Sequence, residues 1–306
     1  DKSDSPRGSY YDYWVVKIDA AGNKLWDKTY GGNDWDELTS MTATPDGGFL
    51  LGGYSSSNTG FDKSDSQRGG YDYWLVKIDS SGKKLWDKTF GGDFVNQLFS
   101  MVATPDGGFL LGGYSNSNAG FDKTDNTRGD YSYDYWVVRI DANGNKLWDK
   151  TYGGADDERL ISMIVVKDSG FLLGGYSESD AGFDKSDGKR GETDYWVVRI
   201  DANGNKEWDR TFGGAEKDEF SSMLTSSDGG FLLGGSSNSN AGFDKSESNR
   251  GDYDYSDYWM VKIDSNGKKL WDKTYGGAGM DELSSMVAMP GGDLLLGGSD
   301  ASSNGF

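Results

Sequence analysis

One unit of about sixty residues recurs along this chain, and the repetition constrains the fold more than any other feature. Tryptophans in the motif "DYW" follow one another in steps of 60, 62, 60 and 63 residues: Trp14, Trp74, Trp136, Trp196 and Trp259. A second series keeps nearly the same spacing: Trp26, Trp86, Trp148, Trp208 and Trp271. The period lies slightly above the propeller range of about 40–50 residues, and the long loop of each unit explains the excess.

Each unit predicts four short β-strands. In the first copies these are residues 13–19 ("YWVVKID"), 24–30 ("KLWDKTY"), 38–45 ("LTSMTATP") and 48–55 ("GFLLGGYS"). They are rich in β-branched and aromatic residues and are separated by turn sequences such as "PDGG". No window has helical periodicity over a helical length. We therefore expect an all-β fold, a five-bladed β-propeller with four antiparallel strands per blade.

The ends of the chain predict how such a ring closes. Repeats begin near residues 1, 61, 121, 183 and 243, and the sequence opens inside the long loop of a copy whose "GF" stands at the other end. We expect a single domain spanning residues 1–306, closed by N- and C-terminal strands that share one blade. Residues 1–34 would supply its outer strands and residues 283–306 its inner strands, with Phe306 near Asp1.

Methionines of the innermost strand are expected to fill the space between neighbouring blades. They occupy equivalent positions in all five copies: Met41, Met101, Met163, Met223 and Met286. The ten repeated tryptophans are likewise expected to be core residues, because both faces of a blade press on its neighbours.

Composition excludes several classes of function. The 306 residues contain neither histidine nor cysteine, which excludes Ser-His-Asp and Cys-His catalysis, disulfides, and zinc sites built from these residues. A net charge of −19 argues against nucleic acid or anionic lipid as a partner. No apolar run is long enough to span a bilayer, so we expect no membrane insertion.

Residues 12–32 ("DYWVVKIDAAGNKLWDKTYGG") and 45–55 ("PDGGFLLGGYS") resemble the tandem kelch-like propeller repeats of secreted and surface proteins of bacteria with type IX secretion. The resemblance covers essentially the whole chain. It implies an extracellular or cell-surface location. Members of that family generally carry a C-terminal sorting domain, so we expect this chain to be part of a larger polypeptide, or a monomer.

The long loop, residues 60–74 ("GFDKSDSQRGGYDYW"), has three interpretations. In the first, loop carboxylates accept hydrogen bonds from loop amides and from Arg68, with Phe61 buried as an anchor. In the second, Asp62, Ser64 and Asp65 and their equivalents hold calcium; no other cofactor is expected. In the third, the loop is a ligand pocket with Tyr71 or Tyr73. The clasp residues of the first interpretation are Asp62, Asp65, Arg68, Asp122, Asp125, Arg128, Asp184, Asp187, Arg190, Asp244, Glu247 and Arg250.

The connection between the fourth strand of one unit and the first strand of the next differs most between copies. It should lie on the same face as the long loops, and unlike residues at one rim position are what a single asymmetric binding site requires. The residues expected to bind a ligand or partner are Trp35, Asp34, Asp36, Phe94, Val95, Asp157, Lys217 and Met280. An alternative explanation is drift in an unconstrained loop.

Acidic residues follow these rim positions and are expected to surround the mouth of a channel, as Asp36 and Asp281 illustrate. Five-bladed glycosidases use carboxylates in such a place, but catalysis needs two carboxyl groups in distinct environments. We therefore expect a noncatalytic binding or spacer module that recognises a glycan or protein. The alternatives are a carbohydrate-active enzyme that uses the acidic mouth, and a purely structural spacer in a larger adhesin-like protein.

Overall fold

A computed structural model describes residues 2–167, 170–251 and 255–301. These residues form twenty β-strands and no helix, which confirms the all-β prediction. Within the same ranges, no helix exists that could cross a membrane.

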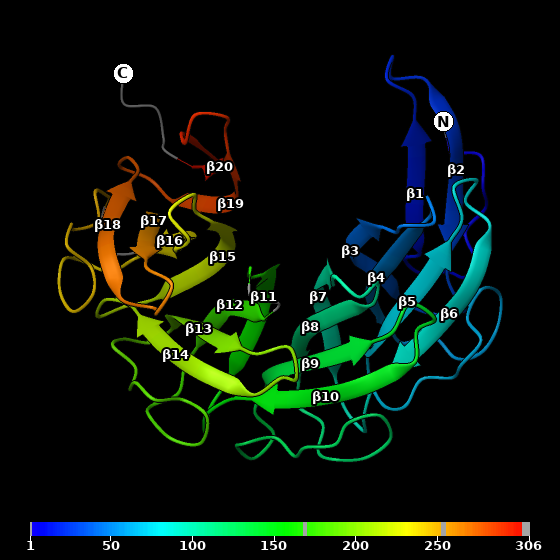
Figure 1. Ribbon diagram of the computed structural model, residues 1–306, viewed down its shortest axis with the longest axis horizontal. Helices are drawn as coiled ribbons and strands as arrows, with labels where there is room; N and C mark the ends of the chain where they lie inside the picture. The colour runs from blue at the N-terminus through cyan, green and yellow to red at the C-terminus, as the bar shows by residue number, and fades with distance from the viewer. Residues whose placement is uncertain (1, 168–169, 252–254, 302–306) are drawn as a thin grey trace. The chain divides into compact units, whose positions relative to one another are not determined.

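Sixteen of the strands form four antiparallel sheets of four strands each, and each sheet follows the order of the sequence (Figure 1). The first contains β3 (Asp36–Ala43), β4 (Phe49–Ser55), β5 (Asp72–Ile78) and β6 (Lys84–Phe90). The second contains β7 (Asn96–Ala103), β8 (Phe109–Ser115), β9 (Asp134–Ile140) and β10 (Lys146–Tyr152). The third contains β11 (Glu158–Val165), β12 (Phe171–Ser177), β13 (Asp194–Ile200) and β14 (Lys206–Phe212). The fourth contains β15 (Asp218–Thr225), β16 (Phe231–Ser237), β17 (Asp257–Ile263) and β18 (Lys269–Tyr275).

The remaining four strands form two two-stranded sheets. One pairs β1 (Tyr13–Ile18) with β2 (Lys24–Tyr30), and the other pairs β19 (Asp281–Ala288) with β20 (Leu294–Asp300). Each corresponds to half of a four-stranded sheet. The predicted strand positions are confirmed, and the repeated meander sheets are like the blades of a propeller.

The chain forms two compact units. Unit 1 contains Asp1–Thr127 and Tyr135–Thr151, and unit 2 contains Arg128–Asp134 and Tyr152–Phe306. Each is described separately below.

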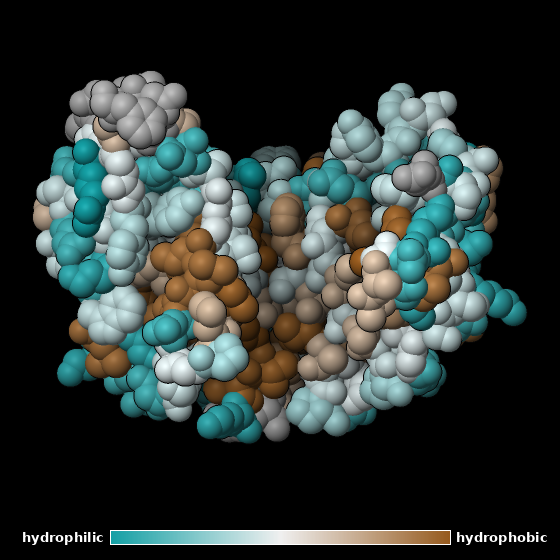
Figure 2. Space-filling model, turned by 90° about the horizontal axis from the view of Figure 1, so that it is seen from above, coloured by the Kyte–Doolittle hydropathy of each residue, from teal (hydrophilic) through white to brown (hydrophobic). Residues whose placement is uncertain are grey.

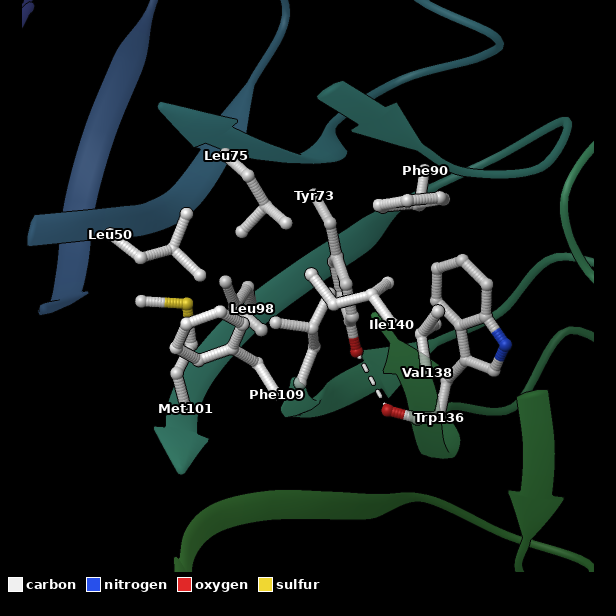
Figure 3. Close-up of a cluster of buried hydrophobic side chains, with 11 residues drawn as sticks. Leu50, Tyr73, Leu75, Phe90, Leu98, Met101, Phe109, Trp136, Val138 and Ile140 are labelled. Carbon is white, nitrogen blue, oxygen red and sulfur yellow. Dashed lines mark hydrogen bonds between the residues drawn. The ribbon is translucent and has the colours of Figure 1, made fainter. Parts of the chain in front are cut away.

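Adjacent sheets of unit 1 meet in an apolar core (Figure 3). Tyr73 and Trp136, both fully buried, come from neighbouring sheets, and the Tyr73 hydroxyl donates to the Trp136 carbonyl at 2.8 Å. Met101 packs where Gly52 leaves room, because a Cβ at Gly52 would lie 2.4 Å from the Met101 sulfur. Gly52 is therefore required by the close approach of the methionine, and Ala at this position would displace it.

Four of the five repeated methionines are buried as predicted: Met101, Met163, Met223 and Met286. Met41 differs, with 64% of its surface exposed. The tryptophans of the first series follow the same rule, since four are fully buried whereas Trp14 is 45% exposed. These two exceptions belong to the first repeat of unit 1, which has no described sheet packed on that side within the unit. The second tryptophan series is not buried as predicted, since four of its members are half-buried and Trp271 is 41% exposed. The prediction about Phe306 and Asp1 lies outside the described residues.

Long loops and rim connections lie on the same side of the sheets, as predicted. The Gly70 amide donates to the Phe94 carbonyl at 2.9 Å, and the Asn96 amide donates to the Tyr71 carbonyl at 2.7 Å. These bonds attach the loop between β4 and β5 to the connection between β6 and β7.

The arginine clasp joins consecutive loops, so the predicted clasp within one loop is wrong in its partners. The guanidinium groups of four of the five loop arginines pair with the aspartate of the next loop: Arg7 with Asp62, Arg68 with Asp122, Arg128 with Asp184, and Arg190 with Asp244. The N–O distances lie between 2.6 and 3.2 Å. Arg7 also pairs with Asp4 of its own loop, at 3.3 Å. Within its own loop, Arg68 donates its backbone amide to Asp72 at 2.6 Å and its Nη1 to the Ser66 carbonyl at 2.9 Å. The side chain reaches the next repeat because Asp72 is already enclosed beneath the loop.

The other clasp acids bind their own sheet. Asp125, Asp187 and Glu247 accept hydrogen bonds from the amides of Thr151, Thr211 and Thr274 on the last strand of each sheet. Phe61 is not the predicted anchor, because 69% of its surface is exposed. The buried residue of the loop is instead Lys63, which is 2% exposed and lies over the Trp74 ring.

Candidate functional site

The rim connection places one variable residue just before the innermost strand of each sheet, and a second two positions later. Residues two apart on a strand point to the same side. The five pairs are Trp35 with Glu37, Val95 with Gln97, Asp157 with Arg159, Lys217 with Glu219, and Met280 with Glu282. Equivalent backbone positions therefore present a different chemistry in each repeat.

Trp35 is the centre of the rim in unit 1. Its ring lies 4.4 Å from the ring of Tyr11, and its indole N–H donates to Glu37 Oε2 at 3.1 Å. Asp34 fixes the backbone there by accepting the Trp35 amide at 2.9 Å, while its own amide donates to Ser57 Oγ at 2.8 Å. Trp35 is half-buried, so one part of the indole is held and the rest is accessible.

Further aromatic residues lie beside and beneath this surface: Tyr71 and Phe99 are half-buried, and Tyr54 and Tyr114 are buried. The Tyr54 ring contacts Tyr71 edge-on at 5.3 Å and Phe99 at 6.2 Å, and Phe99 stacks on Tyr114 at 5.2 Å. Burial and the adjacent Glu37 carboxylate raise the pKa of the Tyr54 phenol, which stays protonated at neutral pH. Gln97 accepts a hydrogen bond from the Tyr114 hydroxyl. We call Tyr11, Trp35, Tyr54, Tyr71, Phe99 and Tyr114, with Glu37 and Gln97, the aromatic rim.

Val95 and Phe94 flank the aromatic rim. Phe94 is 42% exposed, and its amide donates to Ser117 Oγ at 2.9 Å; the Val95 amide donates to Asn116 Oδ1 at 2.9 Å. Trp35, Phe94 and Val95 were predicted at this surface, and Tyr71 was predicted as a possible ligand partner of the long loop. Tyr11, Tyr54, Tyr114 and Phe99 were not predicted. The sequence does show where these tyrosines lie. The next-to-last residue of the second strand of each unit is Tyr54, Tyr114 and Tyr176 in three repeats but Ser236 and Ser299 in two.

The rim positions of unit 2 carry charges. Arg159 lies 5.0 Å from the centre of the Tyr133 ring and 3.6 Å from Asp157 Oδ2. Lys217 pairs with Glu219 at 2.6 Å, with both side chains close to half exposed. Met280 is 38% exposed at the equivalent position. The predicted residues Asp157, Lys217 and Met280 are therefore accessible, and their neighbours are mainly charged rather than aromatic.

Asp36 is not accessible, which corrects its prediction as a ligand-binding residue. It is fully buried and accepts hydrogen bonds from the Gly32 amide at 2.7 Å and from Ser57 Oγ at 3.0 Å. Its role is to hold the turn between β2 and β3. Its equivalents in the other repeats are also buried, at 7% exposure or less: Asn96, Glu158, Asp218 and Asp281. These residues do not form the predicted exposed acidic mouth, because the turn encloses them.

A second acid lies beside each of these buried residues, at the start of the third strand or just before it. Oδ1 of Asp257 and Oδ2 of Asp281 lie 1.9 and 2.7 Å from the position that a Cβ on Gly276 would occupy. Asp134 and Glu158 approach Gly153 in the same way, at 1.8 and 2.8 Å. The recurring "GG" is thus needed because a side chain would collide with two carboxyl groups. These pairs were not predicted, because their members lie more than twenty residues apart in the sequence.

Donor groups of the proposed calcium set are directed at different protein partners. Asp62 pairs with Arg7, and Ser64 donates through both its amide and hydroxyl to Asp87, at 2.8 and 2.6 Å. Across the described ranges, no cluster of three or more acidic side chains is arranged to hold a metal ion.

Comparison with known proteins gives distant similarities. No protein-family model matches the chain. The regulatory protein FlaEY of Caulobacter vibrioides is 23% identical over 214 residues, which are 67% of this chain and 22% of that protein. This chain therefore spans about a fifth of the length of FlaEY.

Solved structures show similarity at low sequence identity. A protein of unknown function from Bacteroides caccae is 15% identical, with a TM-score of 0.43, over 84% of this chain and 73% of that one. The WD40 domain of Neurospora crassa Pan2 is 12% identical, with a TM-score of 0.40, over 78% and 66%. Sqt1 from Chaetomium thermophilum is 13% identical, with a TM-score of 0.45, over 88% and 56%.

Proposed function

We propose that this chain is a noncatalytic binding module that recognises a glycan through the aromatic rim of unit 1. The observation that carries the proposal is the Trp35–Glu37 pair, in which a partly accessible indole stands beside a carboxylate. Aromatic faces stack on the apolar side of sugar rings, and carboxylate or amide groups bind hydroxyls in fixed directions. Gln97 and Phe99 on β7, the first strand of the next sheet, place an amide beside an aromatic ring in a similar way.

The charge of the chain favours a neutral or cationic ligand. A net charge of −19 repels polyanions at a distance. Within the rim, Glu37 adds a further negative charge next to Trp35. We therefore expect neutral polysaccharides to bind in preference to sulfated or uronic-acid polymers.

The same geometry supports a binding role rather than catalysis. The acids first considered as catalytic, Asp36 and Asp281, are buried against the turn. Oδ2 of each accepts a backbone amide at 2.7 Å, from Gly32 and Gly277 respectively. Groups engaged in this way are poorly placed to protonate a leaving group or attack a sugar. Secretion or display at the cell surface, within a larger polypeptide, remains part of the proposal and derives from the resemblance of the repeats.

A glycan-array and polysaccharide screen tests this function, first with calcium and then with a chelator. Trp35→Ala should weaken binding at least tenfold, since central aromatic anchors contribute about 2 kcal/mol or more. Leu85→Ala is the matched control, because Leu85 is 51% exposed on β6 and lies outside the rim. It should leave affinity unchanged.

Each other outcome has a distinct meaning. Binding that Trp35→Ala does not alter would remove the aromatic rim as the site. Binding lost with the chelator would place calcium in the interaction. Hydrolysis of a bound polysaccharide, reduced by Asp36→Asn, would favour the enzyme alternative. No glycan binding in any arm would overturn the proposal and favour a protein partner or a spacer.

We further propose that the chain forms a five-bladed ring, in which β20 pairs with β1 to complete the fifth blade. The support comes from each unit separately. In unit 1, Trp14, Val16 and Ile18 of β1 are 45, 39 and 59% exposed. Their equivalents in β5, which pair with β4, are fully buried: Trp74, Val76 and Ile78.

Unit 2 carries a complementary surface. Leu295 of β20 is 60% exposed, whereas its equivalent Leu50 is fully buried. A Cβ at Gly297 would have no described atom within 4 Å, although the equivalent Gly52 and Gly234 contact Met101 and Met286. Met41 is the exposed methionine that such a glycine would accommodate. Figure 2 shows hydrophobic side chains exposed at the surface, among hydrophilic ones.

A further inference from the structure

Buried carboxyl groups outnumber buried ammonium groups beneath the long loops of unit 2. Asp194, Asp209 and Asp218 are 0 to 1% exposed, and Lys185 and Lys245 are 3 and 2% exposed. Asp209 already has its own cation, because Lys206 Nζ lies 2.7 Å from its Oδ1. Lys185 is therefore left to Asp194 and to Glu158, which both act on it electrostatically.

Buried carboxyl groups also outnumber buried ammonium groups beneath the following loop. Burial lowers the pKa of Lys245, and the carboxylates that oppose this most are Asp218, Asp257 and Asp272. Asp272 has Lys269 at 2.6 Å, so Asp218 and Asp257 share Lys245. The guanidinium group of Arg190 binds Asp244 and the Gly188 carbonyl, and its backbone amide donates to Asp194 at 2.6 Å.

The second acid of the pair lies close to the first. Oδ1 of Asp194 is buried and has no hydrogen-bond partner among the described residues, while Asp218 lies near enough to disfavour its ionisation. Oδ2 of Asp218 accepts the Gly214 amide at 2.7 Å and Ser239 Oγ at 3.0 Å. Two such groups cannot both be ionised without a large cost.

One repeat contains a natural control. Where the others have an acid, the second sheet has Asn96, whose Nδ2 donates to Asp72 Oδ1 at 3.3 Å. Asn96 Oδ1 accepts from Ser115 at 2.7 Å, as Glu158 Oε1 accepts from Ser177 at 2.6 Å. The amide thus occupies the place of the acid and supplies a donor toward its partner. A protonated carboxyl group is the only form of aspartate or glutamate that could do the same.

We propose that each buried acid pair is a proton-binding site, in which one carboxyl group remains protonated and donates to the other at mildly acidic pH. The pairs are Asp134 with Glu158, Asp194 with Asp218, and Asp257 with Asp281, together with Asp36 and its half-buried neighbour Asp12. The ligand is a proton. In the repeat with Asn96 the amide donates to Asp72 in its place, although burial raises the pKa of Asp72 to about 6 as well. The inference is independent of the glycan proposal.

Burial agrees with this assignment and sets the direction of the pH effect. Burial raises the pKa values of Asp194 and Asp218 to about 6 each, and Asp218 adds to the rise at Asp194. A folded-state pKa above the unfolded value near 3.8 means that the bound proton stabilises the fold most at low pH. This stabilisation is lost as the pH rises from about 4 through about 6. The unfolding equilibrium constant should grow by up to about tenfold per pH unit for each proton released.

The direct test is the infrared C=O band of protonated carboxyl groups, recorded at pH 5 to 8 on the full chain. Wild type should show the band at pH 5 to 6 and lose it towards pH 8. Asp218→Asn should lose one part of it and also flatten the dependence of unfolding on pH. Asn96→Asp should gain intensity and steepen that dependence. Asp130→Asn, an exposed acid with the same change of charge, is the control and should alter neither.

The two variants keep the inference testable if one of them fails to fold. Absence of a protonated band in wild type at pH 6, or an unchanged band in both variants, would overturn it. A band that disappears on addition of sodium or calcium, with the protein still folded, would assign the site to a metal cation and also overturn it.

Discussion

Four phenylalanines at equivalent loop positions are exposed in a backbone conformation that favours glycine. Phe61, Phe121, Phe183 and Phe243 have φ angles of 49 to 51° and are 66 to 71% exposed. Each begins a two-residue turn, closed in the first case by the Gly60 amide donating to the Lys63 carbonyl at 3.0 Å. Hydrophobicity predicted burial at Phe61, but the direction of a side chain in so tight a turn depends on φ, which composition does not reveal.

Replacing one of these phenylalanines should cost little stability. Phe121→Gly relieves the left-handed strain and adds unfolded-state entropy, so the free energy of unfolding should change by less than about 1 kcal/mol. Phe109→Ala, at a 2% exposed core position, should lose about 3–5 kcal/mol. Denaturant unfolding measures both. A loss of several kcal/mol in Phe121→Gly would restore the anchor interpretation.

At the scale of the elements, the strand positions could be predicted from the sequence, whereas the ion-pair partners of the loop side chains could not. Alternating apolar residues and turn sequences placed β2 and β4 within a residue of their observed bounds. The same sequence gave every loop an arginine and several aspartates, but spacing alone could not distinguish a clasp within one loop from one between loops. The rim residues Trp35 and Lys217 were detected because they vary, whereas the buried acid pairs were missed because they scarcely vary.

The clasp between loops should contribute modestly to stability. Arg128 and Asp184 are separated by 2.6 Å, with about a quarter of each side chain exposed. A double-mutant cycle with Arg128→Gln and Asp184→Asn should give a coupling energy of about 0.5–1 kcal/mol, reduced by salt. The more exposed pair Lys217–Glu219 is the control and should give less. Equal coupling in both pairs would mean that the clasp is only another surface ion pair.

At the scale of the whole molecule, the repeat count predicts five blades, and the remaining question is how the last meets the first. The pairing of β4 with β5 aligns Leu51 with Val76. By equivalence, the proposed pairing of β20 with β1 would align Leu296 with Val16. The sequence predicts this register because every repeat keeps the same strand lengths. It does not predict whether β20 pairs with β1 of the same chain or with β1 of a second copy, because both are edge strands.

A disulfide tests the closure in a chain that has no cysteine of its own. Val16→Cys with Leu296→Cys should form an intramolecular bond on oxidation, since directly paired strand residues lie within about 5.5 Å. Ile18→Cys with Leu296→Cys is out of register and should form it far less. Disulfide-linked dimers in place of the monomeric product would contradict a closed ring and indicate strand exchange between copies.

The contacts between repeats have a fixed direction, and this bears on how such a chain evolves. Tyr13 donates to the Trp74 carbonyl, Tyr73 to that of Trp136, and Tyr195 to that of Trp259. Arg7 likewise reaches forward to Asp62. A copy inserted by gene duplication would therefore arrive with a donor side that fits its successor and an acceptor side that fits its predecessor. Selection could then act on the rim residues of each copy without redesigning the joints.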